Sequence, residues 1–241
     1  MSGVIGFVAF RAGSKRLPKK NGRKLGDKTL YQIALDKLVA LKRAGVLEAV
    51  VASTDSQEWR THCAETYGAE IVLHNRPAAV SADRSSDTEV VLDFFEQHPE
   101  FKGCAVLLSL CTYPFMKSSV LGQIVQVHKE GNRSVFALTE SHHMPQKLLR
   151  VEGGVIKPYL FERMKEFESN TKVLLEQHPP AFHSTGAFLI ADACQTMTQV
   201  SDLWHQDNIG YVMDDSFHMD IDNLADFELA QLRYEQTKAY E

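Results

Sequence analysis

The fold is decided near the amino end, where residues 4–24 read VIGFVAFRAGSKRLPKKNGRK. The first seven of these residues are apolar and rich in β-branched and aromatic side chains, a pattern typical of a buried strand. The loop Arg11–Lys24 follows at once and holds seven basic residues and no acidic residue. This stretch therefore predicts a strand that delivers a cationic loop to one edge of a sheet.

The rest of the chain alternates short apolar runs with helical patterns. Further strands are expected at 49–53, 70–73, 105–110, 134–138, 187–190 and 209–212. Helices are expected between Thr29 and Gly45, and at 56–67, 87–97, 118–130 and 225–238. This alternation predicts an α/β fold with a doubly wound, mostly parallel sheet, in a single domain that covers residues 1–241.

Ligands of such sheets bind outside the carboxyl ends of the strands. The turns that begin at Arg11, Asp55, Thr112 and Thr139 are therefore expected on one rim. The alternation breaks down at about 139–186, where the sequence is polar, basic and interrupted by prolines. A stretch of this length is typical of a functional insertion or an oligomerisation arm.

Composition and charge argue against several classes of protein. Hydrophobic residues make up 44% and charged residues 24% of the chain, values typical of a soluble globular protein. The net charge of −5 argues against a general nucleic-acid binder. The apolar start ends at Arg11, too early for a signal peptide or a membrane span, and the four cysteines form no CxxC pair. We expect a cytoplasmic protein with reduced thiols and no membrane partner.

The cationic loop has the chemistry of a triphosphate site. Transfer of an α-phosphoryl group places charge on the departing pyrophosphate, which cations and free backbone N–H groups stabilise. Gly13 lets the backbone approach the phosphates closely. The GxxxxGK[ST] and GxGxxG spacings are absent, so the loop is neither a Walker A loop nor a dinucleotide fingerprint. A solvated basic loop or a nucleic-acid patch is the alternative interpretation.

Two aspartates, Asp220 and Asp222, flank Ile221 near the carboxyl end. In an extended segment both carboxylates point to the same side. There they can hold Mg²⁺ while phosphates complete its octahedron, and the ion then polarises the α-phosphoryl group. A DxD pair is a weak signal alone, because acids here also suit the cap of a helix that starts near Ala225, Asp226 among them.

Both motifs resemble those of the acylneuraminate cytidylyltransferase family. RAGSKRLPKKN at 11–21 resembles the family signature RGGSKRLPxKN without a gap, and DIDNLADF at 220–227 resembles DIDxxxDF. STD at 53–55 and RP at 76–77 are similar to two further family turns. TYPF at 112–115 is similar to the TAPF of the CMP-pseudaminic acid synthetase branch. The matches span essentially the whole chain in the family's order.

The resemblance implies a nucleotide-diphospho-sugar transferase-like fold and a nucleotidyltransferase of nucleotide-sugar biosynthesis, serving cell-surface polysaccharides. Such an enzyme joins CMP from CTP to an acidic nine-carbon sugar of the sialic, pseudaminic or legionaminic type and releases pyrophosphate. A homodimer is also implied, in which the segment after Thr139 reaches the partner's sugar site.

The resemblance further implies three groups of site residues. The nucleotide is expected at Arg11, Gly13, Ser14, Lys15, Lys20, Asn21, Arg76, Ser86 and Asp87, with Arg11 and Lys20 acting in catalysis. The sugar is expected at Thr112, His183 and Phe188. The ion Mg²⁺ is expected at Asp220 and Asp222.

The chain departs from the family pattern mainly where the sugar is recognised. Ala12 replaces a glycine of the loop, and Ala9 and Phe10 stand where the family has proline and alanine. Leu110 begins LCTYP where the sialic acid enzymes read QPTSP, so the glutamine amide that touches the sugar is missing. Nucleotide handling is therefore expected to be intact and sugar recognition altered.

Three other functions remain open from the sequence. They are a Kdo or other sugar nucleotidyltransferase, a sugar transferase with a metal-binding DxD, and a catalytically inert nucleotide-binding homologue. Asn21 argues against the Kdo branch, and the late position of the DxD argues against the sugar transferase. His142, His143 and Lys147 are further candidates for the sugar's polar groups, with plain surface residues as the alternative.

Overall fold

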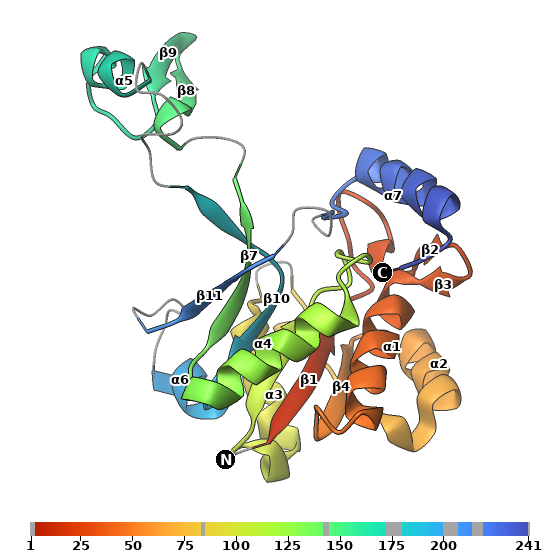
Figure 1. Cartoon of the computed structure of the whole chain (residues 1–241). Coiled ribbons are helices and arrows are strands. Elements are labelled where there is room, and N and C mark those ends of the chain that lie inside the picture. Colours follow the sequence, from red (N-terminus) through yellow and green to blue (C-terminus); the bar gives the residue numbers. More distant parts are fainter. Residues whose placement is uncertain are drawn as a thin grey trace.

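The computed structural model describes residues 3–82, 85–141, 145–171, 180–199, 207–213 and 219–240. Its large sheet has seven strands in the order β11-β7-β10-β6-β1-β4-β5 (Figure 1). Neighbouring strands are parallel except at β10, which runs antiparallel to both β6 and β7. The strands are β1 (Val4–Ala9), β4 (Ala49–Thr54), β5 (Val72–Asn75), β6 (Ala105–Ser109), β7 (Val135–Glu140), β10 (Phe182–Ile190) and β11 (Ile209–Val212).

Helices cover both faces of this sheet. The α-helices are α1 (Leu30–Arg43), α2 (Gln57–Tyr67), α3 (Asp87–Gln97), α4 (Ser118–Gly131), α5 (Met164–Thr171), α6 (Ala193–Gln199) and α7 (Leu224–Thr237). Side chains of α1, α2 and α4 pack on one face, and those of α3 and α6 pack on the other. Strand β1 supplies both cores, because Val4 and Val8 lie in the first and Ile5 and Phe7 in the second. The expected doubly wound, mostly parallel α/β sheet is confirmed.

Local sequence signals set most helix ends. Thr29 caps α1 in a capping box with Gln32, and α2 ends at Gly68, as the sequence predicts. Helix α4 runs through Gly131 and ends at Asn132, which takes the left-handed conformation (φ 49°) in place of the expected glycine stop. The short elements are η1 (Lys20–Gly22), β2 (Lys24–Leu25), β3 (Lys28–Thr29), η2 (Gly68–Glu70), η3 (Ala78–Val80) and η4 (Pro99–Phe101). Strand β5 begins two residues later than expected because η2 precedes it.

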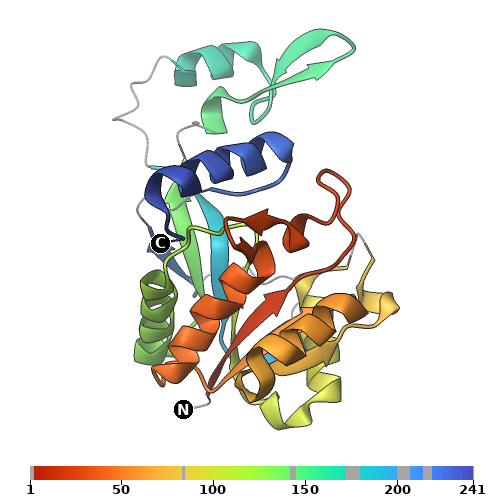
Figure 2. The same cartoon turned by 90° about the vertical axis from the view of Figure 1, so that its right-hand side faces the viewer.

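Residues 145–171 form an arm that stands away from the sheet (Figures 1 and 2). The arm consists of α5 together with η5 (Pro145–Lys147), β8 (Leu149–Glu152) and β9 (Val155–Pro158). It is shorter than the insertion expected at 139–186, because β7 continues to Glu140 and β10 already begins at Phe182. Those strand ends are polar, so the apolar pattern that predicts a strand does not extend to them. Among the described helices, none is both long and apolar enough to cross a bilayer.

Candidate nucleotide-binding site

The cationic loop is anchored from within. Leu17 and Asn21 are buried, and the Asn21 side-chain amide donates to the carbonyl of Arg11 (3.2 Å). The backbone N–H of Ala12 donates to Asp55 Oδ1 (2.8 Å). The loop that follows β1 is therefore tied to the turn that follows β4, so two of the turns expected on one rim are in contact.

The outer part of the loop is open to a ligand. A Cβ atom added at Gly13 would meet no atom of the described structure within 4 Å, so packing does not demand glycine there. The missing side chain instead leaves the backbone free for close approach. Ser14 beside it is half-buried and Lys15 is exposed.

The loop contacts the late acid pair directly. Arg16 Nη1 and Nη2 donate to Asp222 Oδ2 and Oδ1 at 2.8 and 3.0 Å, and Lys20 Nζ donates to Asp222 Oδ1 at 3.1 Å. The side chain of Lys20 is 14% exposed, whereas that of Arg16 is 70% exposed. Because Lys20 is the more enclosed cation, its charge is the less screened by water. The two motifs thus meet in space, as a shared triphosphate site requires.

The acid pair is held at the end of β6. Ile221 is fully buried, and its N–H donates to the carbonyl of Thr112 (2.9 Å). Asp226 Oδ2 accepts from the N–H of Asp222 (2.8 Å) and of Asn223 (2.9 Å). Asn223 is the N-cap of α7, and Asp226 closes the capping box from the third helical position. Asp226 therefore takes part in the cap, and the side chains of the DxD pair are not used for it.

Asp220 and Asp222 fit a hard cation that shares its shell with phosphates. Asp220 Oδ1 is buried and has no hydrogen-bond partner among the described residues. An unpaired buried carboxylate oxygen is costly unless a cation or donor joins it. In the described ranges no cluster of three or more His, Cys, Asp or Glu side chains is placed to hold a metal. Two carboxylates with phosphate and water suit Mg²⁺, which keeps oxygen ligands from its substrate.

Arg76 is a buried cation on the same rim. It follows β5, its N–H donates to the carbonyl of Thr54 (3.3 Å), and its Nε donates to Val80 (2.8 Å). Burial lowers the pKa of Arg76, and the charges of Asp55 and Asp87 oppose that effect. Burial likewise raises the pKa of Asp87, against the attraction of Arg76.

Ser86 lies one residue before Asp87 and has a local task. It is the N-cap of α3, where its Oγ accepts from the N–H of Glu89 (3.2 Å) and its own N–H donates to Glu89 Oε2 (2.7 Å). The rim thus gathers the expected nucleotide residues on the loop, after β5 and at the start of α3.

The expected sugar residues lie in the turn after β6 and along β10. Thr112 lies in the turn that holds Ile221, and His183 is exposed near the start of β10. Phe188 lies farther along β10 and stacks on Phe136, with ring centroids 5.6 Å apart, so its ring belongs to sheet packing. Lys147 is exposed on the arm, and His142 and His143 lie outside the described residues.

Two site features were not expected from the sequence. Arg16 belongs to the SKRLP motif, yet its pairing with Asp222 was not anticipated. Tyr113 follows Thr112, and burial, together with the charge of Asp220, raises the pKa of its hydroxyl to about 12. Arg16 and Tyr113 each interact with an aspartate that is far away in the chain. Only their positions within the motifs could have indicated these interactions.

A buried polar chain supports the rim from below. Ser53 Oγ lies 2.8 Å from His74 Nδ1, and His74 Nε2 lies 2.8 Å from Asp93 Oδ2. Ser53 and His74 are fully buried, so the set is inaccessible to a substrate although it has the order of a hydrolase triad. It fastens the ends of β4 and β5 to α3, directly below the turns that carry Asp55 and Arg76.

The hydrogen-bonded set of Ser53, His74 and Asp93 predicts that the free energy of unfolding depends on pH. Burial lowers the pKa of His74, with Asp93 opposing. The unfolded chain, where the pKa is about 6.5, therefore takes up the proton first as the pH falls. The contribution of His74 to the free energy of unfolding is fully present above about pH 6.5. It declines as the pH falls from there towards the pKa of His74 in the folded protein, by at most about 1.4 kcal/mol per pH unit.

Urea unfolding at pH 7.5 and 5.5 of wild type and His74→Gln measures this contribution. The stability gap between the two proteins should narrow at the lower pH. A gap of equal size at both values would show that protonation of His74 is not linked to folding.

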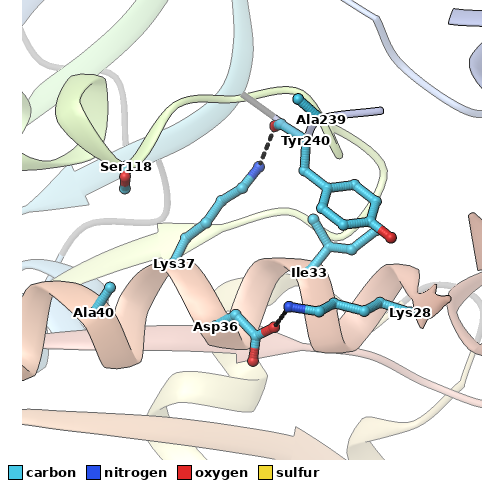
Figure 3. A pocket seen from close by; sticks show the side chains of 8 residues that line it. All are labelled: Lys28, Ile33, Asp36, Lys37, Ala40, Ser118, Ala239 and Tyr240. Atoms are coloured by element: carbon cyan, nitrogen blue, oxygen red, sulfur yellow. Dashed lines mark hydrogen bonds and ion pairs between the residues drawn. The ribbon is translucent and has the colours of Figure 1, made fainter. Parts of the chain in front are cut away.

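A cavity of about 330 Å³ lies beyond the TYPF turn, between α1 and the carboxyl end (Figure 3). Its wall includes Lys37, which is buried and donates to the carbonyls of Pro114 (2.5 Å) and Tyr240 (3.3 Å). Lys28 and Asp36 form an ion pair (2.6 Å) across the same wall. The cavity shares no lining residue with the cationic loop or the acid pair. Lys37 nevertheless links the cavity wall to the TYPF turn, through its hydrogen bond to Pro114.

Comparison with known proteins matches the chain to one family over nearly its whole length. The model of the family described as "Cytidylyltransferase" covers residues 5–237. The chain belongs to the cytidylyltransferase family. This confirms the resemblance of the loop and the acid pair to that family, and with it the enzyme class, nucleotidyltransferase.

Three cytidylyltransferases illustrate the relationship. The N-acylneuraminate cytidylyltransferase of Escherichia coli O18:K1:H7 is 28% identical over 94% of this chain, which spans only 51% of that protein. The CMP-N,N'-diacetyllegionaminic acid synthase of Legionella pneumophila is 29% identical over 82% of both proteins. The pseudaminic acid cytidylyltransferase of Campylobacter jejuni serotype O:2 is 25% identical, over 95% of this chain and 94% of that protein.

The fold of this cytidylyltransferase is shared with a solved structure at low sequence identity. CMP:2-keto-3-deoxy-manno-octonic acid synthetase, solved in complex with CTP, aligns with a TM-score of 0.65 at 14% identity. The alignment covers 98% of this chain and 99% of the other. The expected nucleotide-diphospho-sugar transferase-like fold is therefore confirmed.

Proposed function

We propose that this chain transfers CMP from CTP to an acidic nonulosonic sugar of the sialic, legionaminic or pseudaminic type. The single observation that carries the proposal is the contact of Arg16 and Lys20 with Asp222, which joins the cationic loop to the acid pair at one point. The family match and the names of the relatives support the choice of nucleotide and sugar.

The reaction joins the anomeric hydroxyl of the sugar to the α-phosphorus of CTP. The bond from that phosphorus to the bridging oxygen breaks, pyrophosphate leaves with the electron pair, and the proton of the sugar hydroxyl is released to solvent. Arg11 and Lys20 stabilise the charge that gathers on the leaving phosphates, and the open backbone at Gly13, with Ser14 and Lys15, binds the triphosphate. When bound at Asp220 and Asp222, Mg²⁺ supplies Lewis-acid polarisation of the phosphoryl oxygens.

Without a ligand, Asp222 is paired with two cations, Arg16 and Lys20, which leaves one positive charge in excess at this point. Partial burial opposes ionisation of Asp222, but Lys20, followed by Arg16, holds its pKa below the usual value. CTP competes with this carboxylate for Lys20 and Arg16, and release of the carboxylate creates a metal ligand. Nucleotide and metal are therefore expected to strengthen each other's binding.

The substrate is tested by following pyrophosphate release from CTP with Mg²⁺. The panel holds sialic, legionaminic and pseudaminic acids, Kdo, and a sample without sugar. Turnover on at least one nine-carbon acid, and no turnover with ATP in place of CTP, is expected. CTP binding in calorimetry with no pyrophosphate from any sugar would favour an inert nucleotide-binding homologue.

The arm supports a homodimer. The hairpin β8–β9 pairs Val151 with Ile156, and Leu149 lies on the same face. These three side chains are 48–69% exposed, whereas the opposite face carries the ion pair of Lys157 with Glu152 (2.6 Å). A two-stranded hairpin with an uncovered apolar face is marginal in water, and such faces mark interaction sites.

We predict that Ile156→Asp converts a dimer to a monomer, because a buried unpaired carboxylate is costly at an apolar interface. The matched control is Lys157→Ala, one residue along on the polar face. Light scattering after size exclusion measures the molar mass of each. A monomeric wild type, or a dimer that survives Ile156→Asp, would remove the arm from the interface.

The cellular location and the absence of other partners complete the proposal. All four cysteines are free thiols, which suits a reducing compartment such as the cytoplasm. Two cations of the loop, Arg16 and Lys20, converge on Asp222 at one point. Such a compact cluster suits one small polyanion better than the extended backbone of a nucleic acid.

A further inference from the structure

Tyr113 lies at the point where the TYPF turn, the acid pair and β10 meet. It is 8% exposed, and its hydroxyl is in hydrogen-bonding contact with the side chains of Asp220 and Thr185 and with the backbone at Gly186. A carboxylate can only accept, so the phenol donates its proton to Asp220. The phenol oxygen is left to accept from Thr185 and Gly186.

The ring of Tyr113 is fixed by its surroundings. Strand β10 is irregular between Ser184 and Phe188, and Gly186 there takes the left-handed conformation (φ 52°). A Cβ atom on Gly186 would lie 2.8 Å from Tyr113 Cγ and 2.7 Å from Met116 Cε. The absence of that Cβ lets the backbone of β10 lie against the ring and place its donors at the hydroxyl.

The turn that carries Tyr113 is also fastened on its other sides. Lys37 donates to the carbonyl of Pro114 (2.5 Å), and the N–H of Met116 donates to the carbonyl of Tyr113 (3.1 Å). The N–H of Ile221 donates to the carbonyl of Thr112 (2.9 Å). The same turn therefore fixes the positions of both the Tyr113 phenol and the backbone of the acid pair.

We propose that Tyr113 is a positioning residue for the metal site: its hydroxyl holds Asp220 and presents the buried Oδ1 atom to the cation. Oδ1 has no partner in the described part of the chain, whereas the carboxylate is oriented by the phenol. Groups that orient a metal-binding carboxylate typically change metal affinity by about 10–100-fold when removed. The inference rests on the proposed function, because it assumes that Asp220 binds the metal.

The test is Tyr113→Phe, which keeps the ring and removes only the hydroxyl. Binding of Mn²⁺ to the protein with CTP and no sugar is followed by electron paramagnetic resonance, against CTP and Mn²⁺ alone. We expect about 10-fold weaker Mn²⁺ binding. Binding of CTP in EDTA, measured by calorimetry, should change less than twofold, because the phenol faces the acid pair rather than the loop.

The matched control is Tyr240→Phe. Tyr240 also donates to a carboxylate, Asp27 Oδ1 at 2.6 Å, which is not part of the acid pair. Its loss should leave Mn²⁺ binding unchanged. If Tyr113→Phe does not fold, Thr185→Val removes a hydroxyl that steadies the phenol and should weaken Mn²⁺ binding in the same direction.

The possible outcomes separate this inference from the proposed function. Mn²⁺ binding that is equal in wild type and Tyr113→Phe, or absent from both, would overturn the role of Tyr113. Equal losses of Mn²⁺ and metal-free CTP binding would also overturn it, because they would show a general loosening of the site. A clear loss of Mn²⁺ binding in a protein that forms no pyrophosphate from any sugar would leave the inference standing and reject the function.

Discussion

Lys20→Ala is expected to lower kcat/KM for CTP by roughly 10²–10³-fold. Lys20 is the more enclosed of the two cations that contact Asp222, at 3.1 Å and 14% side-chain exposure. Charge that grows on the departing pyrophosphate is stabilised most by a cation that is already in place and shielded from water. Steady-state pyrophosphate release at saturating sugar gives the two constants separately.

The matched control for this variant is Lys24→Ala. Lys24 is exposed in β2, at the carboxyl end of the cationic sequence, and the substitution removes the same charge from the chain. Its kcat/KM should stay within about twofold of wild type, as is usual for a solvated surface charge. A threefold or smaller loss in Lys20→Ala, or equal losses in both variants, would mean that Lys20 acts only through the overall charge of the loop.

Asp222→Asn is expected to raise the Mg²⁺ concentration needed for half-maximal activity by at least about 10-fold. The amide keeps the size of the side chain but loses the charge that a hard cation prefers. Binding of CTP in EDTA should tighten at the same time, because Arg16 and Lys20 are released from their intramolecular partner. A metal titration and calorimetry in EDTA measure these opposite changes.

Glu235→Gln serves as the control, since Glu235 is an exposed carboxylate on α7. It should change neither quantity. An unchanged Mg²⁺ titration in Asp222→Asn would remove this residue from the metal site. Weaker metal-free CTP binding in that variant would contradict the idea that Asp222 competes with the phosphates.

Much of the fold could be predicted because its signals are local. The bounds of α3 (Asp87–Gln97) and β11 (Ile209–Val212) agree with those expected, and the capping box at Thr29 marks the start of α1. The position of β10 could not be predicted. It runs antiparallel between β6 and β7, a pairing between segments far apart in the chain, and its first half is polar.

In the candidate site, too, local motifs could be predicted from the sequence and contacts between distant residues could not. The loop and the acid pair are each legible as motifs, and their chemistry suggests a common ligand. The contact between Arg16 and Asp222 depends on how residues 206 positions apart are brought together. The buried chain through His74 was missed for another reason: each of its members is an ordinary polar residue, and only burial on neighbouring strands gives them a shared role.

Transfer of CMP is tested most directly with CTP labelled with ³²P at the α-phosphorus, together with Mg²⁺ and a nonulosonic acid that supports pyrophosphate release. We expect the label to appear in a CMP-sugar, and label placed at the γ-phosphorus to appear only in pyrophosphate. Transfer of the γ-label to the sugar, or an α-label recovered as free CMP and not in a CMP-sugar, would show that the chain does not catalyse this transfer.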